Sequence, residues 1–261
     1  MKPQVTLAAF VCLSALRLLA QEERPAAELL ERVDRTLRPS KSFTVTIEAT
    51  TYKDRSAVGS ITVHALVRVP ATTAPPDLLA TLTAPESERG KMYLRKTDGL
   101  WFYDPKAKRP VRISAQQRLY GQASLDDFMS TDLRSDYAPK LEADETVNDS
   151  AGQARSCQKL RLTALRKSAP YAAITLWVDR DNHQAVKATC FAAAGRPLRT
   201  VYYGKFRGFL GSARPTEVQL VDEVRPGTVT QLRFSDFDER DMPEAWFDPA
   251  QLPQTQQALS K

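Results

Sequence analysis

The chain has 261 residues, a formal net charge of +6 and a hydrophobic fraction of 42%, so it can bury a substantial core and global disorder is excluded. It contains no block of five like charges, no arginine–aromatic repeat and no recognition-helix motif, which argues against nucleic-acid binding. Seventeen prolines against ten glycines indicate many short elements separated by turns, within one large β-domain or two small domains.

The first twenty residues differ from the rest of the chain. Lys2 precedes an almost wholly apolar run over residues 5–20, and a charged stretch ends that run at residues 21–25. This layout is typical of a secretory signal peptide. The run is shorter than the roughly 20 apolar residues that span a bilayer, and it carries Arg17. We therefore predict a signal peptide over residues 1–20, with an uncleaved membrane anchor as the alternative and the cleavage point left open.

Residues 25–38 are predicted to form a helix that packs on the core. Pro25 suits the first helical position, and Pro39 follows the end of the segment. One apolar stripe recurs at helical spacing: Leu29, Leu30, Val33 and Leu37.

From residue 42 the hydrophobic period changes from that of a helix to that of a strand. Residues 43–52 and 60–69 alternate strictly between apolar and polar side chains, which predicts two strands with one buried face and a hairpin turn over 53–59. Further strands are expected at 77–84, 90–97, 100–104, 109–114, 137–147, 155–166, 172–180, 184–193, 197–207, 215–223 and 228–238.

Two segments break this strand pattern. Residues 122–134 are predicted to form a short helix capped by Ser124, with Leu125, Phe128 and Met129 on one face. A lone helix among strands is expected to cover an open sheet face or a barrel mouth. The C-terminal residues 242–252 are expected to form a turn or short helix that docks Trp246 and Phe247 on the body.

About a dozen strands with one or two helices is too many for a small sandwich. We predict a mainly β fold, a highly curved antiparallel sheet that forms an incomplete barrel with helices over its concave face. In a simple meander another strand separates Cys157 from Cys190, which favours two free buried thiols, although export would permit a disulfide. Cys12 follows Val11, which is not the small residue that precedes a lipobox cysteine, so Cys12 is assigned to the discarded segment.

The residues that could carry chemistry are sparse. His64 and His183 have no metal-ligand neighbours at the expected spacing, and the known nucleophile, metalloprotease, P-loop and dinucleotide motifs are absent from the sequence. Asp126 and Asp127 suit the first turn of a helix, and the acidic residues of 236–241 suit a solvated turn. The sequence therefore predicts a protein that is not an enzyme and has no metal or cofactor.

Aromatic clusters give a stronger signal. Residues Trp101 to Tyr103 form a consecutive aromatic run that faces both sides of its strand, so part of it requires a cover such as a helix or a ligand. The segment 206–210 (FRGFL) is either a buried β-turn or a loop at a mouth or membrane contact.

Three stretches together resemble the outer-membrane lipoprotein-sorting family, the LolA/LolB-like proteins. These are LWFYDPKAKRPVRISAQQRLYGQASLDDFMSTDL (100–133), ITLWVDRDNHQAVKATCFAAAGRPLRTVYYGKF (174–206) and VTQLRFSDFDERDMPEAWFDPAQL (229–252). The likeness covers roughly residues 40–252 and includes no catalytic residue. After Met129 this chain reads STDLRSDY, where relatives carry a more glycine-rich stretch, so a ligand-specific interpretation of that loop is not drawn.

The resemblance implies a curved antiparallel sheet of roughly eleven strands, closed by helices, in one domain over residues 21–261. It implies a monomeric periplasmic carrier that shields lipoprotein acyl chains or another lipid in an apolar cavity, with an inner-membrane lipid transporter as a candidate partner. An envelope lipid-sensing or scaffold domain is the alternative, and a lipid hydrolase is a more distant one. The cargo and the donor and acceptor membranes are left open.

The candidate ligand wall follows from the strand pattern. Inward residues of the first two strands and the aromatic strand would either line the cavity, with the 124–133 helix as its lid, or form ordinary core, because both environments favour the same side chains. These residues are Phe43, Val45, Ile47, Val63, Val67, Trp101, Tyr103, Leu125, Phe128 and Met129.

Overall fold

The computed structural model of the protein describes residues 25–37, 40–71, 75–114, 118–120, 123–124, 133–167 and 169–259. The predicted signal peptide and the predicted lid residues Leu125, Phe128 and Met129 lie outside these ranges. Strands of the first half are β1 (Phe43–Lys53), β2 (Ser56–Arg68), β3 (Asp77–Ala84), β4 (Met92–Lys96), β5 (Gly99–Tyr103), β6 (Pro110–Ile113), β7 (Arg118–Tyr120) and β8 (Ala123–Ser124). Strands of the second half are β9 (Tyr137–Leu141), β10 (Glu145–Asn148), β11 (Ala154–Ala164), β12 (Ala173–Asp179), β13 (Ala185–Phe191), β14 (Pro197–Phe209), β15 (Ser212–Asp222) and β16 (Thr228–Glu239).

Helical elements are few and short. Residues 25–37 are helical, as expected. The others are η1 (Glu86–Glu88), α3 (Leu133–Asp136), η2 (Glu244–Phe247), η3 (Pro249–Gln251) and α4 (Leu252–Leu259). None of the helices in the described ranges is both long and apolar enough to cross a lipid bilayer.

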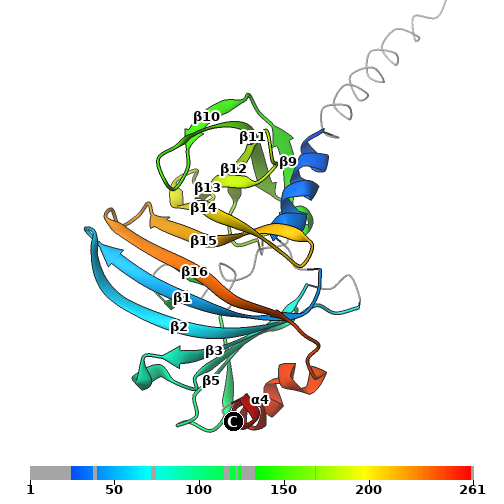
Figure 1. Ribbon diagram of the computed structural model, residues 1–261, viewed down its shortest axis with the longest axis vertical. Helices are drawn as coiled ribbons and strands as arrows, with labels where there is room; N and C mark the ends of the chain where they lie inside the picture. Colours follow the sequence, from blue (N-terminus) through cyan, green and yellow to red (C-terminus); the bar gives the residue numbers. More distant parts are fainter. Residues whose placement is uncertain are drawn as a thin grey trace, which may run out of the picture.

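Fourteen strands form one strongly curved antiparallel sheet (Figure 1). Its order is β10-β11-β12-β13-β14-β15-β16-β1-β2-β3-β4-β5-β6, with β9 also paired to β11, so the last strand of the chain lies beside the first. Strands β7 and β8 form a separate pair. Within the part of the chain that the structure describes, the sheet ends at β6 and β10 and is not closed into a barrel. The predicted fold class is confirmed, with more strands than the eleven expected.

Side-chain alternation explains the two faces of the sheet. In β1 the residues Phe43, Val45, Ile47 and Ala49 are buried and contribute to one apolar cluster. Their register partners in β2 are Val67, Ala65, Val63 and Ile61, which belong to the same cluster. Because β-branched side chains pack well on a pleated surface, this pairing gives the concave face a continuous apolar floor.

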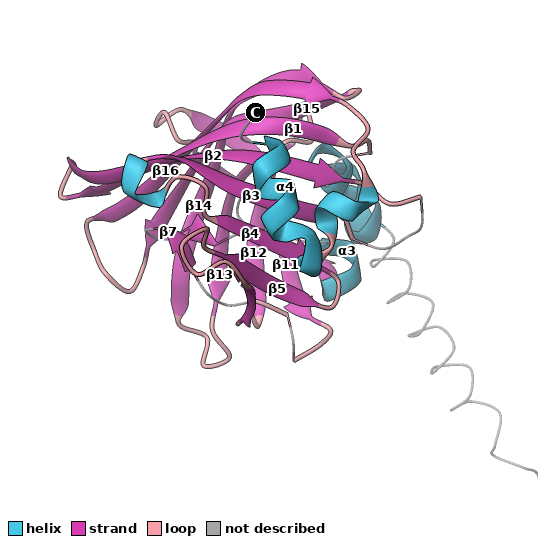
Figure 2. Cartoon of the chain, turned by 90° about the horizontal axis from the view of Figure 1, so that it is seen from below, coloured by secondary structure: helices cyan, strands magenta, loops and turns pink. Residues whose placement is uncertain are grey.

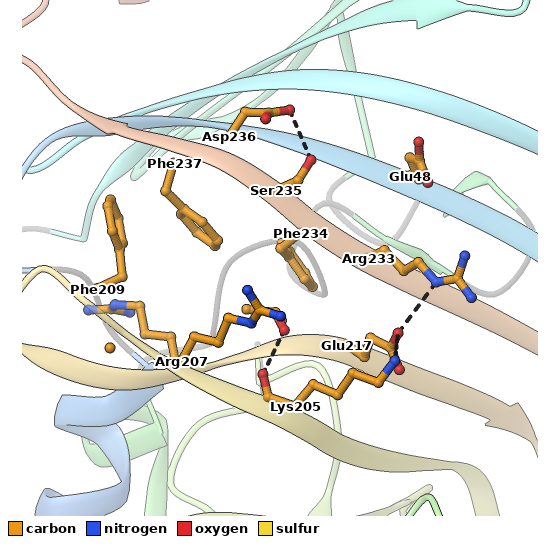
Figure 3. A pocket seen from close by; sticks show the side chains of 13 residues that line it. Glu48, Lys205, Arg207, Phe209, Glu217, Arg233, Phe234, Ser235, Asp236 and Phe237 are labelled. Carbon is orange, nitrogen blue, oxygen red and sulfur yellow. Dashed lines mark hydrogen bonds and ion pairs between the residues drawn. The ribbon is translucent and has the colours of Figure 1, made fainter.

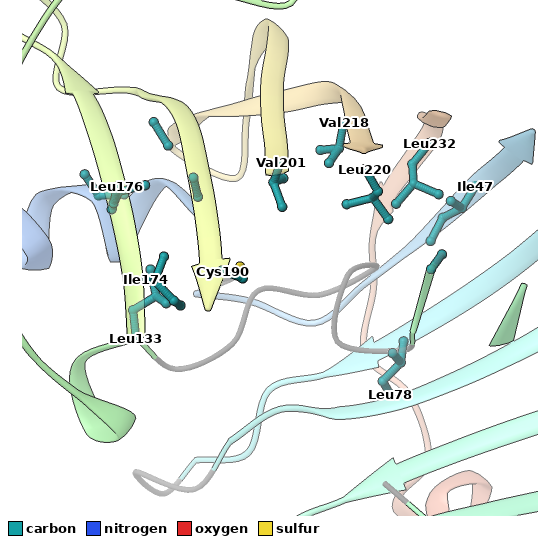
Figure 4. Close-up of a cluster of buried hydrophobic side chains, with 14 of the residues drawn as sticks. Ile47, Leu78, Leu133, Ile174, Leu176, Cys190, Val201, Val218, Leu220 and Leu232 are labelled. Atoms are coloured by element: carbon teal, nitrogen blue, oxygen red, sulfur yellow. The ribbon is translucent and has the colours of Figure 1, made fainter. Parts of the chain in front are cut away.

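The concave cluster gathers residues from both halves of the sheet. Figure 4 shows Ile47, Leu176 and Leu220 among the side chains of facing strands that point into a shared interior. The helix over 25–37 covers part of this interior with Ala26, Leu29, Leu30 and Val33, which are all buried. Gly59 of β2 permits a close approach of Tyr120, because a Cβ at this position would collide with the phenol oxygen.

The C-terminal elements lie on the opposite, convex face. Figure 2 shows α4 crossing β3 and β4. Phe247 and Leu252 are fully buried there against a second cluster that contains Leu66, Leu79 and Met92. The docking expected for this terminus is confirmed. The helix over 25–37 covers the concave face, as expected, and the C-terminal elements cover the convex face in addition.

Two local predictions also require correction. Ala123–Ser124 form strand β8 instead of the start of a helix, Leu133–Asp136 form helix α3, and residues 125–132 of the predicted helix lie outside the described residues. The single strand expected over 137–147 is two strands, because β9 pairs with one end of β11 and β10 with the other. The exposed residues between them mark the break.

Both cysteines of the described sheet are buried, and neither forms a disulfide. Cys157 pairs with Asp179 at one end of β12, and Cys190 pairs with Ile174 at the other end. The intervening strand therefore keeps the thiols apart, as predicted from the order of the strands. Burial raises the pKa of the Cys157 thiol to about 11, which suits an inert thiol.

Candidate functional site

The structure brings together five of the residues predicted to line a cavity. All five are buried in the concave cluster, on adjacent strands: Phe43, Val45, Ile47, Val63 and Val67. They form the apolar floor beneath the helix over 25–37.

The aromatic strand β5 is placed differently. Tyr103 is buried in the convex cluster, and Trp101 packs against the same cluster. The guanidinium of Arg112 lies 5.6 Å from the Trp101 ring centroid. Phe102 faces the other way and stacks on Tyr93 with their centroids 4.9 Å apart. C-terminal residues therefore cover one face of this aromatic run. Trp101 and Tyr103 lie on that convex face, away from the five concave residues.

Strand pairing is incomplete at one place beside the concave floor. Pairing of β15 with β16 runs from Val221↔Val229 only as far as Glu217↔Arg233. Beyond that point β15 continues pairing with β14 as far as Ser212, and β16 continues pairing with β1 as far as Glu239. The two strands therefore diverge, and we call the resulting opening the β15–β16 split.

A β-bulge shapes the split. The register of β1 and β16 shifts between Thr44 and Thr46, opposite Asp236, whose φ is 51°. A bulge of this kind bends its strand and re-aims the following side chain. Here Phe237 follows, and its ring centroid lies 4.5 Å from that of Phe209 and 6.0 Å from that of Phe43. The ring centroids of Phe43 and Phe209 lie 5.7 Å apart. We call these three rings the aromatic trio.

A pocket of about 590 Å³ occupies the split (Figure 3). Its lining comes from both faces of the sheet. Phe209, Phe234 and Phe237 pack against the concave cluster, whereas Glu48 and Arg233 alternate with concave residues and belong to the outer face. The split therefore connects the outer surface with the rim of the apolar interior.

Charged side chains surround the polar part of the pocket. The Lys205 ammonium lies 2.7 Å from a Glu217 oxygen, and Arg233 lies 3.4 Å from the same oxygen. Arg207 and Arg214 are direct cross-strand partners in the β14–β15 hairpin. Arg214 is only 6% exposed, its Nη1 donates to the Leu37 carbonyl at 3.0 Å, and burial lowers its pKa to about 10.

Sequence reasoning missed most of this pocket. The segment 206–210 is the end of β14, and the turn consists of Leu210 and Gly211, which both have positive φ. This pair matches the turn chemistry of a tight hairpin. The change of spacing in β16, where Phe234 and Phe237 are three residues apart in an otherwise alternating strand, is the signal that could have revealed the bulge.

The histidines stand apart from the pocket. His64 is half-buried on β2, where burial and then the charge of Arg240 lower its pKa. His183 lies in a turn with its Nε2 3.1 Å from Arg32 Nη1. Within the described residues no group of three or more histidine, cysteine or acidic side chains could hold a metal ion. The pocket offers an apolar wall and fixed charges, an arrangement suited to binding an amphiphilic molecule.

Comparisons with known proteins support the same assignment of fold. A family model described as "uncharacterized protein" matches residues 77–254. A search of curated protein sequences found no match.

Solved structures resemble most of this chain. A LolA superfamily protein from Nitrosomonas europaea is 31% identical, with a TM-score of 0.73 over 85% of this chain and 97% of that protein. A putative outer membrane lipoprotein-sorting protein domain from Vibrio parahaemolyticus is 17% identical, with a TM-score of 0.76 over 88% of this chain and 99% of the other. A DUF1329 family protein from Desulfovibrio piger is 17% identical, with a TM-score of 0.73 over 87% of this chain and 97% of the other.

Proposed function

Because this chain belongs to the LolA superfamily, we propose that it is a periplasmic carrier of lipoprotein acyl chains or of another lipid, which it moves between envelope membranes. The acyl chain binds on the concave side, along the floor formed by β1 and β2. The aromatic trio forms the entrance from the β15–β16 split. In this proposal residues 1–20 are a signal peptide, residues 21–261 are one domain, and Leu125, Phe128 and Met129 remain predicted lid residues.

The observation that carries the proposal is the continuity between the pocket and the apolar interior. Phe43 belongs to the concave cluster and contacts both Phe209 and Phe237, which line the pocket. A ligand seated in the split would therefore meet apolar surface directly inward of it. The pocket volume of about 590 Å³ lies in the range of ordinary ligand sites, roughly 300–1,000 Å³.

Burial of an acyl chain provides enough free energy for a carrier. Each buried methylene contributes about 0.8 kcal/mol, so a chain of about fifteen carbons gains on the order of 10 kcal/mol before ordering costs. Such a carrier needs no reactive group, and we propose that the protein is not an enzyme. A monomeric state and an inner-membrane lipid transporter as partner belong to the same proposal.

A scaffold role on the same fold is less well supported. A protein-binding face would be a contiguous exposed apolar patch. The large aliphatic side chains most exposed in the described residues lie on separate segments of the chain: Val58, Val111, Leu165 and Val224. These are scattered positions of a kind that ordinary soluble surfaces carry.

Native mass spectrometry of the mature protein from a periplasmic extract tests the proposal, followed by identification of extracted lipids. We expect a bound lipid or acylated protein at a defined stoichiometry. An apo mass, together with no uptake of added lipid or acylated peptide, would overturn the carrier function and favour the scaffold.

A further inference from the structure

We propose that the β15–β16 split binds the anionic head group of a lipid, so that the cargo is a lipid with a phosphate at its polar end. This inference rests on the proposed carrier function and narrows its cargo. It distinguishes an anionic lipid from an uncharged acylglyceryl group as the species that seats in the pocket.

The first argument is the pair of arginines that face each other across the β14–β15 hairpin. Arg207 and Arg214 are register partners, and both line the pocket. Like charges directly opposite each other on neighbouring strands destabilise a sheet. An anion between or beside the two guanidinium groups would convert this repulsion into attraction.

The second argument is the burial of one of these cations. Arg214 is 6% exposed and is held in place by the Leu37 carbonyl at the end of the helix over 25–37. Burial and this hydrogen bond fix the position of the guanidinium, which lines the pocket. Its planar fork of donors matches the oxygen geometry of a phosphate.

The acidic side chains that line the pocket interact with other groups or lie away from Arg207. Glu217 already accepts from Lys205 and also pairs with Arg233. Asp236 accepts from the Ser235 hydroxyl at 2.9 Å and is exposed. In Figure 3 Asp236 and Glu48 lie on the far side of β16 from Arg207.

The third argument is the order of polar and apolar groups. Phe209 is two residues beyond Arg207 on the same strand, so the two side chains share the concave-facing side of β14. The aromatic trio therefore begins directly beside the cations. A ligand that contacts both needs a negative head adjoining an apolar chain, which is the composition of an anionic lipid.

The test measures uptake of two lipids with identical acyl chains from vesicles by the mature protein: phosphatidylglycerol, which is anionic, and diacylglycerol, which is uncharged. We expect the wild type to prefer phosphatidylglycerol by about tenfold, as charge-assisted hydrogen bonds allow. Arg207→Gln should abolish this preference. Arg196→Gln is the matched control, because Arg196 is exposed in the turn before β14, away from the pocket. It should retain the preference.

Glycerol phosphate without an acyl chain identifies the source of the bound phosphate. We expect it to compete only weakly, because it lacks the chain that the aromatic trio would contact. If it binds as tightly as the lipid, the ligand is a free phosphate compound and the inference is wrong.

The remaining outcomes separate the two proposals. Equal uptake of both lipids by the wild type, or an undiminished preference in Arg207→Gln, would overturn the head-group site and leave the carrier function standing. Uptake of neither lipid by the wild type, together with no uptake of an acylated peptide, would overturn the carrier function itself.

Discussion

Opposite faces of the same strands carry two apolar clusters that are covered in different ways. On the convex face, Phe247 and Leu252 from the C-terminal elements bury the side chains of β2 to β5. On the concave face, the helix over 25–37 covers the floor, but the cluster continues to the aromatic trio at the β15–β16 split. The comparison teaches that burial alone does not mark a binding surface. Incomplete strand pairing beside a buried surface adds access from outside, and for this reason the proposed entrance lies at the split.

The largest loss of stability is expected from a substitution on the convex face. Phe247→Ala should lower the free energy of unfolding by about 3–5 kcal/mol, because it removes a fully buried ring from a closed cluster. Urea denaturation measures this change. Lipid uptake per folded molecule should stay at the wild-type level, since the ring lies on the face away from the split. Reduced uptake by the folded variant would break the distinction between the two faces.

Phe237→Ala should reverse that pattern. The ring is only partly buried, so the cost in unfolding free energy should be about 2 kcal/mol. Lipid uptake should fall severalfold, because the aromatic trio loses its central contact. Phe237→Leu serves as the matched variant and should restore much of the uptake by keeping apolar volume. If Phe237→Ala takes up lipid normally, the split is not the entrance.

A smaller loss of stability is expected from a substitution near the turn that joins β15 and β16, where the two strands stay paired. Burial alone would raise the pKa of Asp222, but the Arg225 side chain and the N–H groups of Val224 and Arg225 together outweigh burial and lower it. The charged carboxylate therefore stabilises the turn at any pH above the unfolded pKa of 3.8, and this contribution is lost as the pH falls through the lower folded pKa. Asp222→Asn should cost about 1 kcal/mol at neutral pH.

The pH profile checks the assignment of this carboxylate. Thermal unfolding of the wild type and Asp222→Asn should differ at neutral pH and converge at the acid end of the profile. A difference that stays constant across this range would show that the charge of Asp222 does not stabilise the turn.

The smallest predicted effect is on the rates at which the two thiols are alkylated. Cys157 belongs to a small convex cluster and Cys190 to the concave one, and both should react with iodoacetamide far more slowly in the native protein than in urea. Peptide mapping measures the two rates separately. Bound lipid should slow Cys190 further and leave Cys157 unaffected. An intact mass that indicates a disulfide would contradict the strand order.

Much of the fold could be predicted because period-2 alternation directly reports one buried face. Phe43, Val45 and Ile47 alternate with polar residues, and the structure buries all three on the concave side. The limit of this signal is visible at Leu66, which occupies a position of the polar set in the 60–69 alternation and is nevertheless buried. Periodicity identifies the face of a strand, but it does not reveal that a segment nearly two hundred residues later covers that face.

The candidate site was less predictable for a related reason. The split depends on where the pairing of β15 and β16 stops, which is a property of two strands and a bulge together. The aromatic run 101–103 predicts either a helix or a ligand as its cover, and Phe247 of η2 provides that cover at Trp101 and Tyr103. Phe209 and Phe237 are 28 positions apart in the sequence, and only the fold brings their rings together.

The most direct test of the account is photocrosslinking with a lipid that carries a diazirine on its acyl chain, followed by peptide mapping of the mature protein. The account predicts adducts on the concave floor and the aromatic trio, at peptides that contain Phe43, Ile47, Phe209 or Phe237. Adducts concentrated on Trp101, Tyr103 or Phe247 would contradict it, because they would place the lipid on the convex face.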